Sequence, residues 1–431
     1  MLKLSAAGDI ILMGALPRAY HEISASLGRY LADADIRTAN METTLTAYDH
    51  FASTFCGGTW LSAPASILSE LEIFGFHHYS FANNHSMDYS YGGLLATLEA
   101  LAGRGLQASG AGCDLAEASR HRLVDSPAGR AAFISITATA DPSAKAGLGH
   151  GPFPGRPGVN RLDHEEVFTV RPQQMRALEA VAAATSINGR LDNSKRGGYT
   201  PTEPGIFNLG PIRFAEGGEP GKMTRPREAD CLRVEAAIRA ARQEADVVVV
   251  SCHSHEIKGA SDEEPDYFLE EFARRCIDQG ASALICSGTH QIKAVEIYRG
   301  APIFYSVANF IFRSDQVAEL PLDFYEKYRV PPHYSAGEAL AVRSAKGTRG
   351  LQTDRSNYLG LVPTLSFDRG RLAEIALAPV ELCFDLGPGL KGLPRLAEGP
   401  AFDLIYQKLK TLSQPYGTSF RRDQGLIRID L

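Results

Sequence analysis

The stretch DVVVVSCHSHE, residues 246–256, sets the fold class because it joins a long apolar strand to two histidines. Four consecutive valines are typical of a strand that is buried on both faces, as in a parallel sheet covered by helices. Helical patterns precede and follow this strand, at Glu228–Glu244 and Tyr267–Gln279. This alternation of helix and strand predicts a layered α/β domain.

The first 140 residues repeat the alternation. Strands are expected at Lys3–Ala7, at HHYSFA (residues 77–82) and at Gly129–Ala138, with helices at Ala63–Phe74 and Leu94–Leu101. The same pattern at both ends of this region favours one large α/β unit over separate all-α and all-β parts.

Residues 142–226 break the pattern, because they are rich in Gly and Pro and contain only one clear helix, at Pro172–Ala184. A long irregular stretch in a compact protein is typical of a functional insertion or of a tolerated linker. We favour an insertion that contacts the substrate. Further along the chain we expect a hairpin near Leu361–Leu377, a helix near Phe402–Leu412 and a last strand at Leu426–Asp430.

Composition excludes several classes of protein. The formal net charge of −6 over 431 residues argues against general nucleic-acid binding, which depends on excess positive charge. The seven cysteines include no CxxC pair, so neither a disulfide framework nor a thiolate zinc site is expected. No apolar run reaches the ~20 residues needed to cross a bilayer, and the N-terminus does not resemble a signal peptide. We therefore expect a cytoplasmic protein that does not contact a membrane.

Polar side chains follow the predicted strands at five places. In open α/β folds the carboxyl ends of strands form the ligand site. The side chains are Asp9, Asn40 with Glu42, Asn83 with Asn84 and His85, His253 with His255, and His290.

This set of donors predicts a divalent metal ion held by oxygen and nitrogen atoms. Carboxylate, amide and imidazole ligands suit Mn²⁺, Fe²⁺, Zn²⁺ or Ca²⁺. Such an ion can polarise a carbonyl or phosphoryl oxygen, and a neighbouring histidine can transfer protons near neutral pH.

The motifs AAGDIILMG, NMETTLT, FANNHSMDYSYGG, SCHSHE and YSVANF occur in an order that resembles CapA-like proteins, the poly-γ-glutamate capsule family. The resemblance covers about residues 3 to 312. It implies the calcineurin-like metallophosphatase fold, a β-sandwich flanked by helices in four α/β/β/α layers. We expect this domain at residues 1–312, with the insertion at about 142–226, and an extension at 313–431 that packs on the same domain.

Residue by residue, the resemblance implies that Asp9, Glu42, Asn84, His253 and His290 hold the metal. His85 would lie beside Asn84 as a general acid. His255 is left between a site residue and a surface residue, because the family often has a small residue at that position.

One position departs from the family pattern. The family usually has Gly-His-x-x-His, but Ser287 replaces the first of these histidines. The loss of one ligand weakens two-metal phosphoester hydrolysis and favours a single bound ion.

Together these features predict a metal-dependent acid/base enzyme that acts on a peptide. One branch of the family resembles enzymes that invert an α-carbon in ribosomally made lasso peptides, and we expect this epimerisation here. Asp9, His85 and His290 would transfer protons, while His255, Arg421 and Arg422 would bind the substrate. Of the two interpretations of Arg421 and Arg422, a solvated pair is favoured over a pair that binds a carboxylate.

The alternatives are hydrolysis of a phosphoester or of a γ-glutamyl amide, and a role in poly-γ-glutamate capsule assembly. A non-catalytic protein that binds a glutamate-rich polymer is a third class. The grouping of acid, amide and imidazole side chains argues against this third class, since simple binding does not require it.

Overall fold

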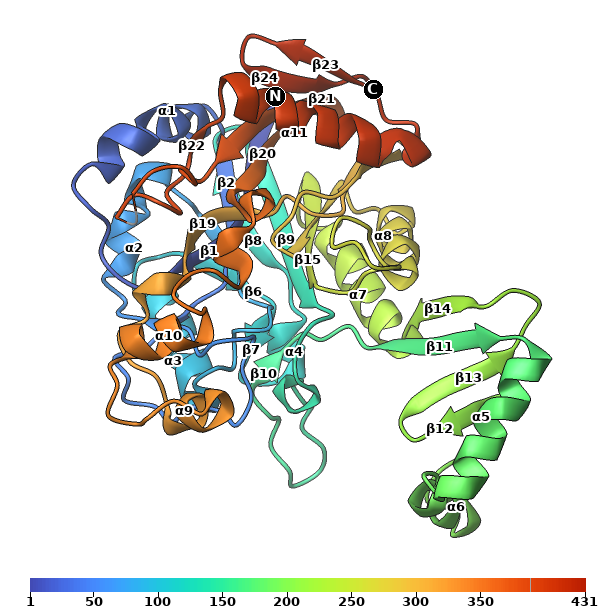
Figure 1. The fold of residues 1–431 in the computed structure, drawn as a ribbon. Helices are drawn as coiled ribbons and strands as arrows, with labels where there is room; N and C mark the ends of the chain where they lie inside the picture. The colour runs from blue at the N-terminus through green and yellow to red at the C-terminus, as the bar shows by residue number, and fades with distance from the viewer. Residues whose placement is uncertain (388) are drawn as a thin grey trace.

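A computed structural model describes residues 1–387 and 389–431. Two β-sheets pack face to face, and helices cover the outer face of each, which confirms the four-layer α/β/β/α architecture of the metallophosphatase type (Figure 1). Buried side chains of the two sheets form one core between them, and each outer face has a second core against its helices.

The larger sheet is built around β1, whose two halves have different neighbours on one side. Leu2–Ser5 pairs antiparallel with β20, while Asp9–Leu12 pairs parallel with β19. On its other side β1 pairs parallel with β2. The strands of this sheet are β1 (Leu2–Leu12), β2 (Ile36–Met41), β5 (His78–Ser80), β6 (Gln107–Ser109), β19 (Asn309–Arg313), β20 (Leu359–Asp368), β21 (Arg371–Glu381), β22 (Arg395–Leu396), β23 (Phe420–Asp423) and β24 (Leu426–Ile429).

The smaller sheet has the valine strand at its centre. Val247 and Val249 enter the core between the sheets, whereas Val248 and Val250 pack against the outer helices, so both faces are buried as the sequence predicted. This strand is parallel to both of its neighbours. The strands, in spatial order, are β17 (Val295–Tyr298), β18 (Ala301–Phe304), β16 (Ala283–Gly288), β15 (Val247–Ser254), β9 (Gly129–Thr137) and β8 (Arg122–Ser126).

The helices sort into two outer layers. α1 (Tyr20–Ala32), α2 (Ile67–Glu70) and α3 (Ser90–Ala102) cover the larger sheet, and α7 (Glu228–Ala241) and α8 (Tyr267–Asp278) cover the smaller one. The helix expected at Ala63–Phe74 is shorter than predicted: α2 gives way to the 3₁₀ turn η1 (Glu72–Phe74), which ends at the left-handed Gly75. The remaining short elements of the main body are α4 (Leu115–Ala118), η2 (Pro142–Ala144), η6 (Gln414–Tyr416), and the strand pairs β3 (Thr44–Leu45) with β4 (Ser62–Ala63) and β7 (Ala111–Gly112) with β10 (Gly158–Val159).

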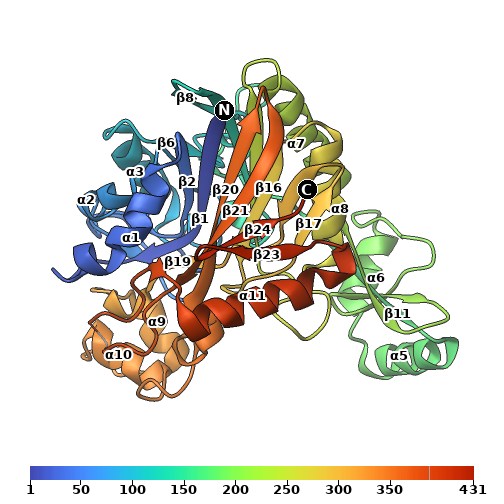
Figure 2. The same cartoon turned by 90° about the horizontal axis from the view of Figure 1, so that it is seen from above.

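Most of the Gly/Pro-rich insertion forms a separate lobe that projects from the body (Figures 1 and 2). The prediction of irregular chain with one helix was wrong here, because the lobe has its own sheet and a second helix. Its strands are only partly buried and carry many charged residues, so they lack the apolar signal of a core strand. The elements are β11 (His164–Val170), α5 (Pro172–Thr185), α6 (Gly189–Arg196), β12 (Phe207–Leu209), β13 (Ile212–Glu216) and β14 (Gly221–Pro226).

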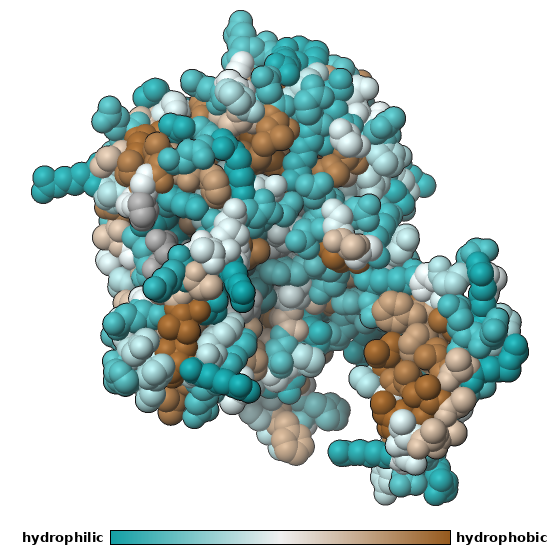
Figure 3. Space-filling model, in the orientation of Figure 1, coloured by the Kyte–Doolittle hydropathy of each residue, from teal (hydrophilic) through white to brown (hydrophobic). Residues whose placement is uncertain are grey.

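The lobe exposes apolar side chains. Figure 3 shows an apolar patch over it, and Ile187, Ile212 and Met223 are each about half exposed. The earlier part of the insertion stays on the body, where β10 pairs with β7.

The C-terminal segment contributes strands to the larger sheet. The predicted hairpin is confirmed as β20 and β21, and β20 pairs directly with β1. The predicted helix and last strand are confirmed as α11 (Gly399–Ser413) and β24. The elements between β19 and β20 are η3 (Ser314–Gln316), α9 (Leu322–Tyr328), α10 (Ala336–Arg343), η4 (Leu351–Thr353) and η5 (Arg355–Tyr358).

Among the described residues, no helix combines the length and the apolar character needed to traverse a lipid bilayer.

The point where β1 changes neighbours requires glycine. The amide of Asp9 donates to the carbonyl of Ala308 at 3.1 Å, and a Cβ on Gly8 would lie 1.7 Å from that carbonyl oxygen. We expect Gly8→Ala to lower the free energy of unfolding by about 3 kcal/mol or more, at or beyond the upper end of overpacking costs. Urea unfolding followed by circular dichroism measures this change.

Gly14→Ala is the matched control, because a Cβ on Gly14 meets no atom within 4 Å. The control should stay within about 0.5 kcal/mol of the parent protein. Equal unfolding midpoints for the two variants would contradict this account of the strand crossing.

Candidate metal centre

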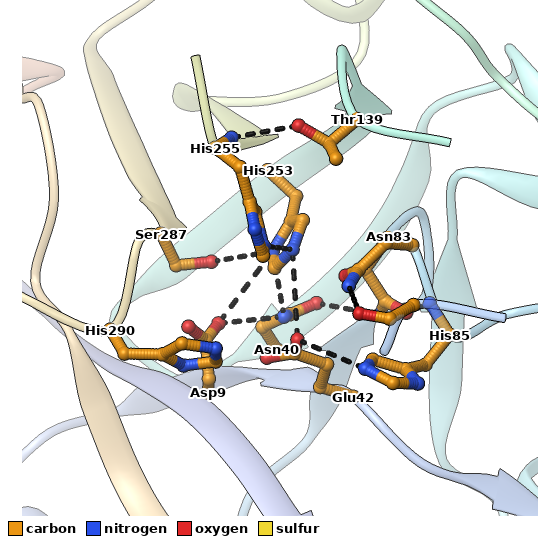
Figure 4. Close-up of polar contacts among 12 residues, drawn as sticks. Asp9, Asn40, Glu42, Asn83, His85, Thr139, His253, His255, Ser287 and His290 are labelled. Atoms are coloured by element: carbon orange, nitrogen blue, oxygen red, sulfur yellow. Dashed lines mark hydrogen bonds and ion pairs between the residues drawn. The ribbon is translucent and has the colours of Figure 1, made fainter. Parts of the chain in front are cut away.

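Strand register brings the predicted polar residues to one place at the end of both large sheets (Figure 4). Asp9 of β1 lies opposite Asn40 of β2 and opposite Asn309 of β19. In the facing sheet, His253 of β15 lies opposite Ser287 of β16. The site therefore forms where the two sheets of the sandwich meet.

The loops that follow these strands supply the other side chains. Glu42 comes directly after β2, His290 comes two residues after β16, and Asn83, Asn84 and His85 form the turn after β5. His290 holds a left-handed backbone conformation with φ of 61°. A non-glycine residue in this conformation costs roughly 1–2 kcal/mol, so the fold must hold the imidazole in place against that cost.

Asp9 and Glu42 are buried carboxylates without compensating partners. Asp9 Oδ1 accepts a hydrogen bond from Asn40 Nδ2 at 2.7 Å, but Asp9 Oδ2 and both oxygens of Glu42 have no hydrogen-bond partner. Burial raises the pKa of Asp9 to about 6 and that of Glu42 well above its usual range. Buried charges are normally paired or bound to a metal, so these oxygens fit a cation.

Three imidazoles lie beside the carboxylates. The Nε2 atoms of His253 and His255 are 3.1 Å apart, and His253 Nε2 lies 3.7 Å from Glu42 Oε1. Burial lowers the pKa values of His253 and His255 well below the usual range and that of His290 to about 4. All three are therefore neutral at pH 7, which is the form that binds metals.

The donors form two groups that share Glu42. One group is Asp9, Glu42 and His253, and the other is Glu42, His255 and His290, with the ligand atoms of each group within 4.8 Å of one another. Two nitrogens bound to one ion at about 2.1 Å would be about 3.0–3.4 Å apart. The separation of His253 and His255 fits this range.

Ser287, which stands where the family pattern has histidine, positions another ligand. Its hydroxyl lies 3.1 Å from His253 Nδ1, on the side of the ring away from His255. The hydroxyl therefore orients an imidazole and does not replace one.

His85 is tied to a buried acid. Its Nδ1 lies 2.6 Å from Asp88 Oδ2, and its Nε2 lies 4.0 Å from Glu42 Oε1. Asp88 also accepts hydrogen bonds from the backbone amides of Leu61 and Gly57. Asp88 therefore fixes the ring so that Nε2 faces the carboxylate cluster.

Asn83 and Asn84 have different roles. Asn83 holds the site together, since its Nδ2 donates to Asn40 Oδ1 at 3.2 Å and its Oδ1 accepts from the His85 amide at 3.0 Å. Asn84 donates from Nδ2 to the Gly57 carbonyl, while its Oδ1 is buried without a partner. This free amide oxygen suits a metal ion or a substrate N–H group.

A cavity of about 320 Å³ opens beside the cluster. Asn84 and His255 line it, together with Thr139, Arg161 and Glu256. The polar character of this cavity suits the amides of an extended chain.

The structure does not bring Arg421 and Arg422 to this site. Both lie on β23 at the edge of the larger sheet (Figure 2). Arg421 pairs with Asp430 there, and Arg422 pairs with Asp403. Arg422 also stacks over the Tyr406 ring. His255, the third predicted substrate residue, does face the cluster.

Asn309 was missed by sequence reasoning. Its Oδ1 accepts from His290 Nδ1 at 2.9 Å, and its own Nδ2 donates to the carbonyl of Asn357 at 2.8 Å. The YSVANF motif contained it, but nothing in that motif indicates a contact with a histidine 19 residues earlier.

The layers and the donor cluster define a metallophosphatase-like α/β/β/α protein with a candidate metal centre. A family model described as "Bacterial capsule synthesis protein PGA_cap" matches residues 3–314, so the chain belongs to that family. The resemblance to CapA-like proteins inferred from the motifs is confirmed.

Individual relatives of this chain support the same family. The "Uncharacterized protein y4uA" of Sinorhizobium fredii is 30% identical over 98% of this chain and 92% of its own length. A "Probable polyglutamine synthesis accessory protein" of Mycobacterium tuberculosis is 26% identical over 64% of this chain and 55% of its own length. The "PGA biosynthesis protein CapA" of Bacillus subtilis is 23% identical over 54% and 41%, respectively.

The buried carboxylates predict an unusual pH dependence for the metal-free protein. Below the ordinary Asp pKa of 3.8, Asp9 is protonated both folded and unfolded and costs nothing. As the pH rises through about 6, the unfolded chain has ionised and the folded chain must bury a charge, so stability falls. We expect Asp9→Asn to be more stable than the parent above pH 7, by on the order of 2–3 kcal/mol.

Thermal unfolding in EDTA at pH 4 and pH 7.5 measures this difference, which should shrink to below about 1 kcal/mol at pH 4, close to the ordinary Asp pKa of 3.8. Asp192→Asn, at an exposed position of α6, should show no such gain. Mn²⁺ at pH 7.5 should stabilise the parent more than Asp9→Asn. Equal melting temperatures of parent and Asp9→Asn in EDTA at pH 7.5 would contradict the uncompensated charge.

Proposed function

We propose that the protein is a metal-dependent acid/base enzyme that acts on a peptide and inverts an α-carbon. A ribosomally made precursor peptide of the lasso type is the proposed substrate. The names of the relatives from M. tuberculosis and B. subtilis refer to polyglutamine and PGA synthesis, and this supports a polyamide chain as the substrate class.

One observation carries the proposal: two imidazoles flank the carboxylate cluster and have unlike partners. In Figure 4, His85 and His290 lie on opposite sides of Glu42. Asn309 gives His290 a neutral amide oxygen, whereas Asp88 gives His85 a buried carboxylate. Two groups can invert a carbon centre when a base removes the proton from one face and an acid adds one to the other.

The hydrogen bonds assign the proton positions. Because Asn309 Oδ1 accepts, His290 carries its proton on Nδ1, and its Nε2 lone pair is free to take the α-proton. His85 donates from Nδ1 to Asp88, which can balance the charge of a second proton on Nε2. His85 Nε2 would give its own proton to the opposite face, and until then the electron pair from the C–H bond is held on the neighbouring carbonyl oxygen. His290 would then lose the α-proton to solvent and His85 would take up a proton from solvent, which restores both imidazoles.

The metal ligands in this reaction would be Asp9, Glu42 and His253. A bound divalent ion would polarise the substrate carbonyl and so lower the cost of charge on its oxygen. With one ion in this group, His255 Nε2 also lies close enough to bind it, and His290 stays free. A single ion leaves His290 available for proton transfer. Ser287 also supports a single ion, because it contacts the ligand His253 where the family pattern has another histidine.

Hydrolysis is the second candidate, and the shared ligand Glu42 favours it. Two donor groups with one common carboxylate could hold two ions that clamp a phosphoester or an amide during cleavage. The same His85 would then protonate the leaving group.

Incubation in D₂O with Mn²⁺ separates the two reactions. We expect a lasso-type precursor peptide to gain one mass unit at one α-carbon without cleavage, and the deuterated residue to appear as the D-form by chiral chromatography. His290→Gln and His85→Gln should each slow exchange by about 10²–10⁴-fold, as expected for loss of a general acid or base. EDTA should also abolish exchange.

His333→Gln, an exposed histidine, is the control and should exchange at the parental rate. Parallel assays follow release of p-nitrophenol from its phosphate and cleavage of poly-γ-glutamate. Brisk turnover of either compound, with no deuterium in any peptide, would replace the epimerase proposal with hydrolysis.

A further inference from the structure

The insertion lobe has one sheet face that is apolar. Strand register places Phe168 of β11, Phe214 of β13 and Phe207 of β12 in one row, because Phe214 lies opposite both of the others. The ring centroids of Phe168 and Phe214 are 6.0 Å apart. Directly paired residues share a face of the sheet, and so do alternate residues of one strand. The apolar residues of this face, which we call the Phe face, are Phe168, Val170, Phe207, Leu209, Ile212 and Phe214.

The Phe face is partly open to solvent. None of its six apolar side chains is fully buried, and Ile212 is 45% exposed. Figure 3 shows an apolar patch on the surface of the lobe. Contiguous apolar patches on a folded protein mark interaction sites. The Phe face is therefore a candidate contact surface.

The root of the lobe is fastened to the body. Lys222 of β14 donates to the carbonyl of Ile257 at 2.8 Å and pairs with the fully buried Asp266 at 2.5 Å. His164 of β11 stacks on Phe268 of α8, with ring centroids 4.3 Å apart. Mobile regions have few buried contacts, whereas two strands are anchored here. We therefore do not expect the lobe to close onto the body and cover its own Phe face.

The Phe face continues from the cavity beside the metal centre. His164, the first residue of β11, lines the cavity of about 320 Å³ together with Asn84 and His255. His164 and Phe168 share a face of β11, because they are four residues apart and the side-chain period of a strand is two. At about 3.3 Å per residue, the two positions are about 13 Å apart. An extended chain that leaves the cavity along β11 would reach the Phe face after about four residues.

The charges on this side of the lobe favour an apolar occupant. Glu166 and Lys222 lie on the same face as Phe168 and pair with each other at 3.3 Å, so neither lacks a counter-charge. A glutamate-rich polymer would lose hydration against the rings without gaining an ion pair, which is costly. An apolar stretch of peptide would instead remove its own side chains from water.

The Phe face is small for a contact between two copies of the chain. Stable interfaces take about 20–30 residues from each partner. This face offers six apolar side chains. A peptide that is already held in the cavity needs less contact, because its second binding event is intramolecular and has a high effective concentration.

We propose that the Phe face is a docking site for an apolar segment of the peptide substrate, at least about four residues along the peptide from the residue that reacts. The inference rests on the proposed function, because it takes the occupant to be another part of the same peptide. It assigns the lobe to substrate capture, whereas the imidazoles act on the α-carbon.

Ile212 and Met223 allow a matched test. They are 45% and 46% exposed, but they lie on opposite faces of the lobe sheet. Lys222 lies opposite Phe168 and shares its face, so Met223, the next residue, points to the other face. Glutamate adds the same charge at either position, and substitutions at exposed positions seldom destabilise a fold. Only Ile212→Glu places that charge on the Phe face.

Fluorescence anisotropy measures binding of a fluorescein-labelled lasso-type precursor peptide to the full-length, Mn²⁺-loaded protein and to both variants. We expect Ile212→Glu to weaken binding by about tenfold or more, as for the loss of one interface anchor. Met223→Glu should weaken it by less than about twofold, as for a surface change outside the contact. The rate of deuterium exchange at saturating peptide should be the same in the parent and both variants, since the Phe face does not touch the α-carbon.

Unchanged binding in Ile212→Glu, equal weakening by the two variants, or no binding to the parent would overturn the docking site. A parent dimer that Ile212→Glu converts to a monomer, seen by size-exclusion chromatography with light scattering, would assign the Phe face to a second copy instead. The anisotropy measurement involves no turnover, so it is separate from the test of function. Binding that depends on Ile212 without deuterium exchange would remove the epimerase proposal and keep the docking site. Exchange with binding that ignores Ile212 would do the reverse.

Discussion

Two buried carboxylates without a counter-charge are the constraint on which the rest of this structure depends. Burial of Asp9 and Glu42 costs stability unless a cation binds there, since the described chain gives three of their four oxygens no hydrogen-bond partner. The surrounding imidazoles are neutral, so they add ligand atoms without competing charge. A cluster that costs stability in this way persists only where the surrounding fold holds it firmly, and such clusters are typical of functional sites.

The pairing of strands in the sandwich holds the carboxylate cluster in place. Because β1 changes partner at Gly8, its second half runs beside β19 and carries Asp9 between Asn40 and Asn309. The C-terminal hairpin pairs with the first half of the same strand. The site at the end of β1 therefore depends on chain segments more than 300 residues apart, and the C-terminal segment is part of the sheet that builds it.

Local sequence patterns predicted a layered α/β domain and most of the residues of the cluster, whereas the four-layer sandwich was expected from the resemblance to CapA-like proteins. A run of valines marks a strand buried on two faces, and a polar residue after such a strand marks the ligand edge. Long-range contacts have no such signal: Asn309 meets His290 only after folding. The strands of the lobe were missed because they bury little apolar surface. Their faces are half polar, so they lack the apolar pattern of a core strand. Arg421 and Arg422 resembled an anion site in sequence. In the structure they lie on an edge strand and form ion pairs with nearby aspartates.

The site is asymmetric, because its two sides have different surroundings. On one side, Asn84, the neighbour of His85 in the chain, lines a cavity together with Arg161 and Glu256. On the other, His290 stacks on Phe312, whose far side faces an apolar cavity. The partners of the two imidazoles follow the same division, because a carboxylate lies behind His85 and an amide oxygen behind His290. The two imidazoles therefore differ in the charge that can balance a second proton on the ring.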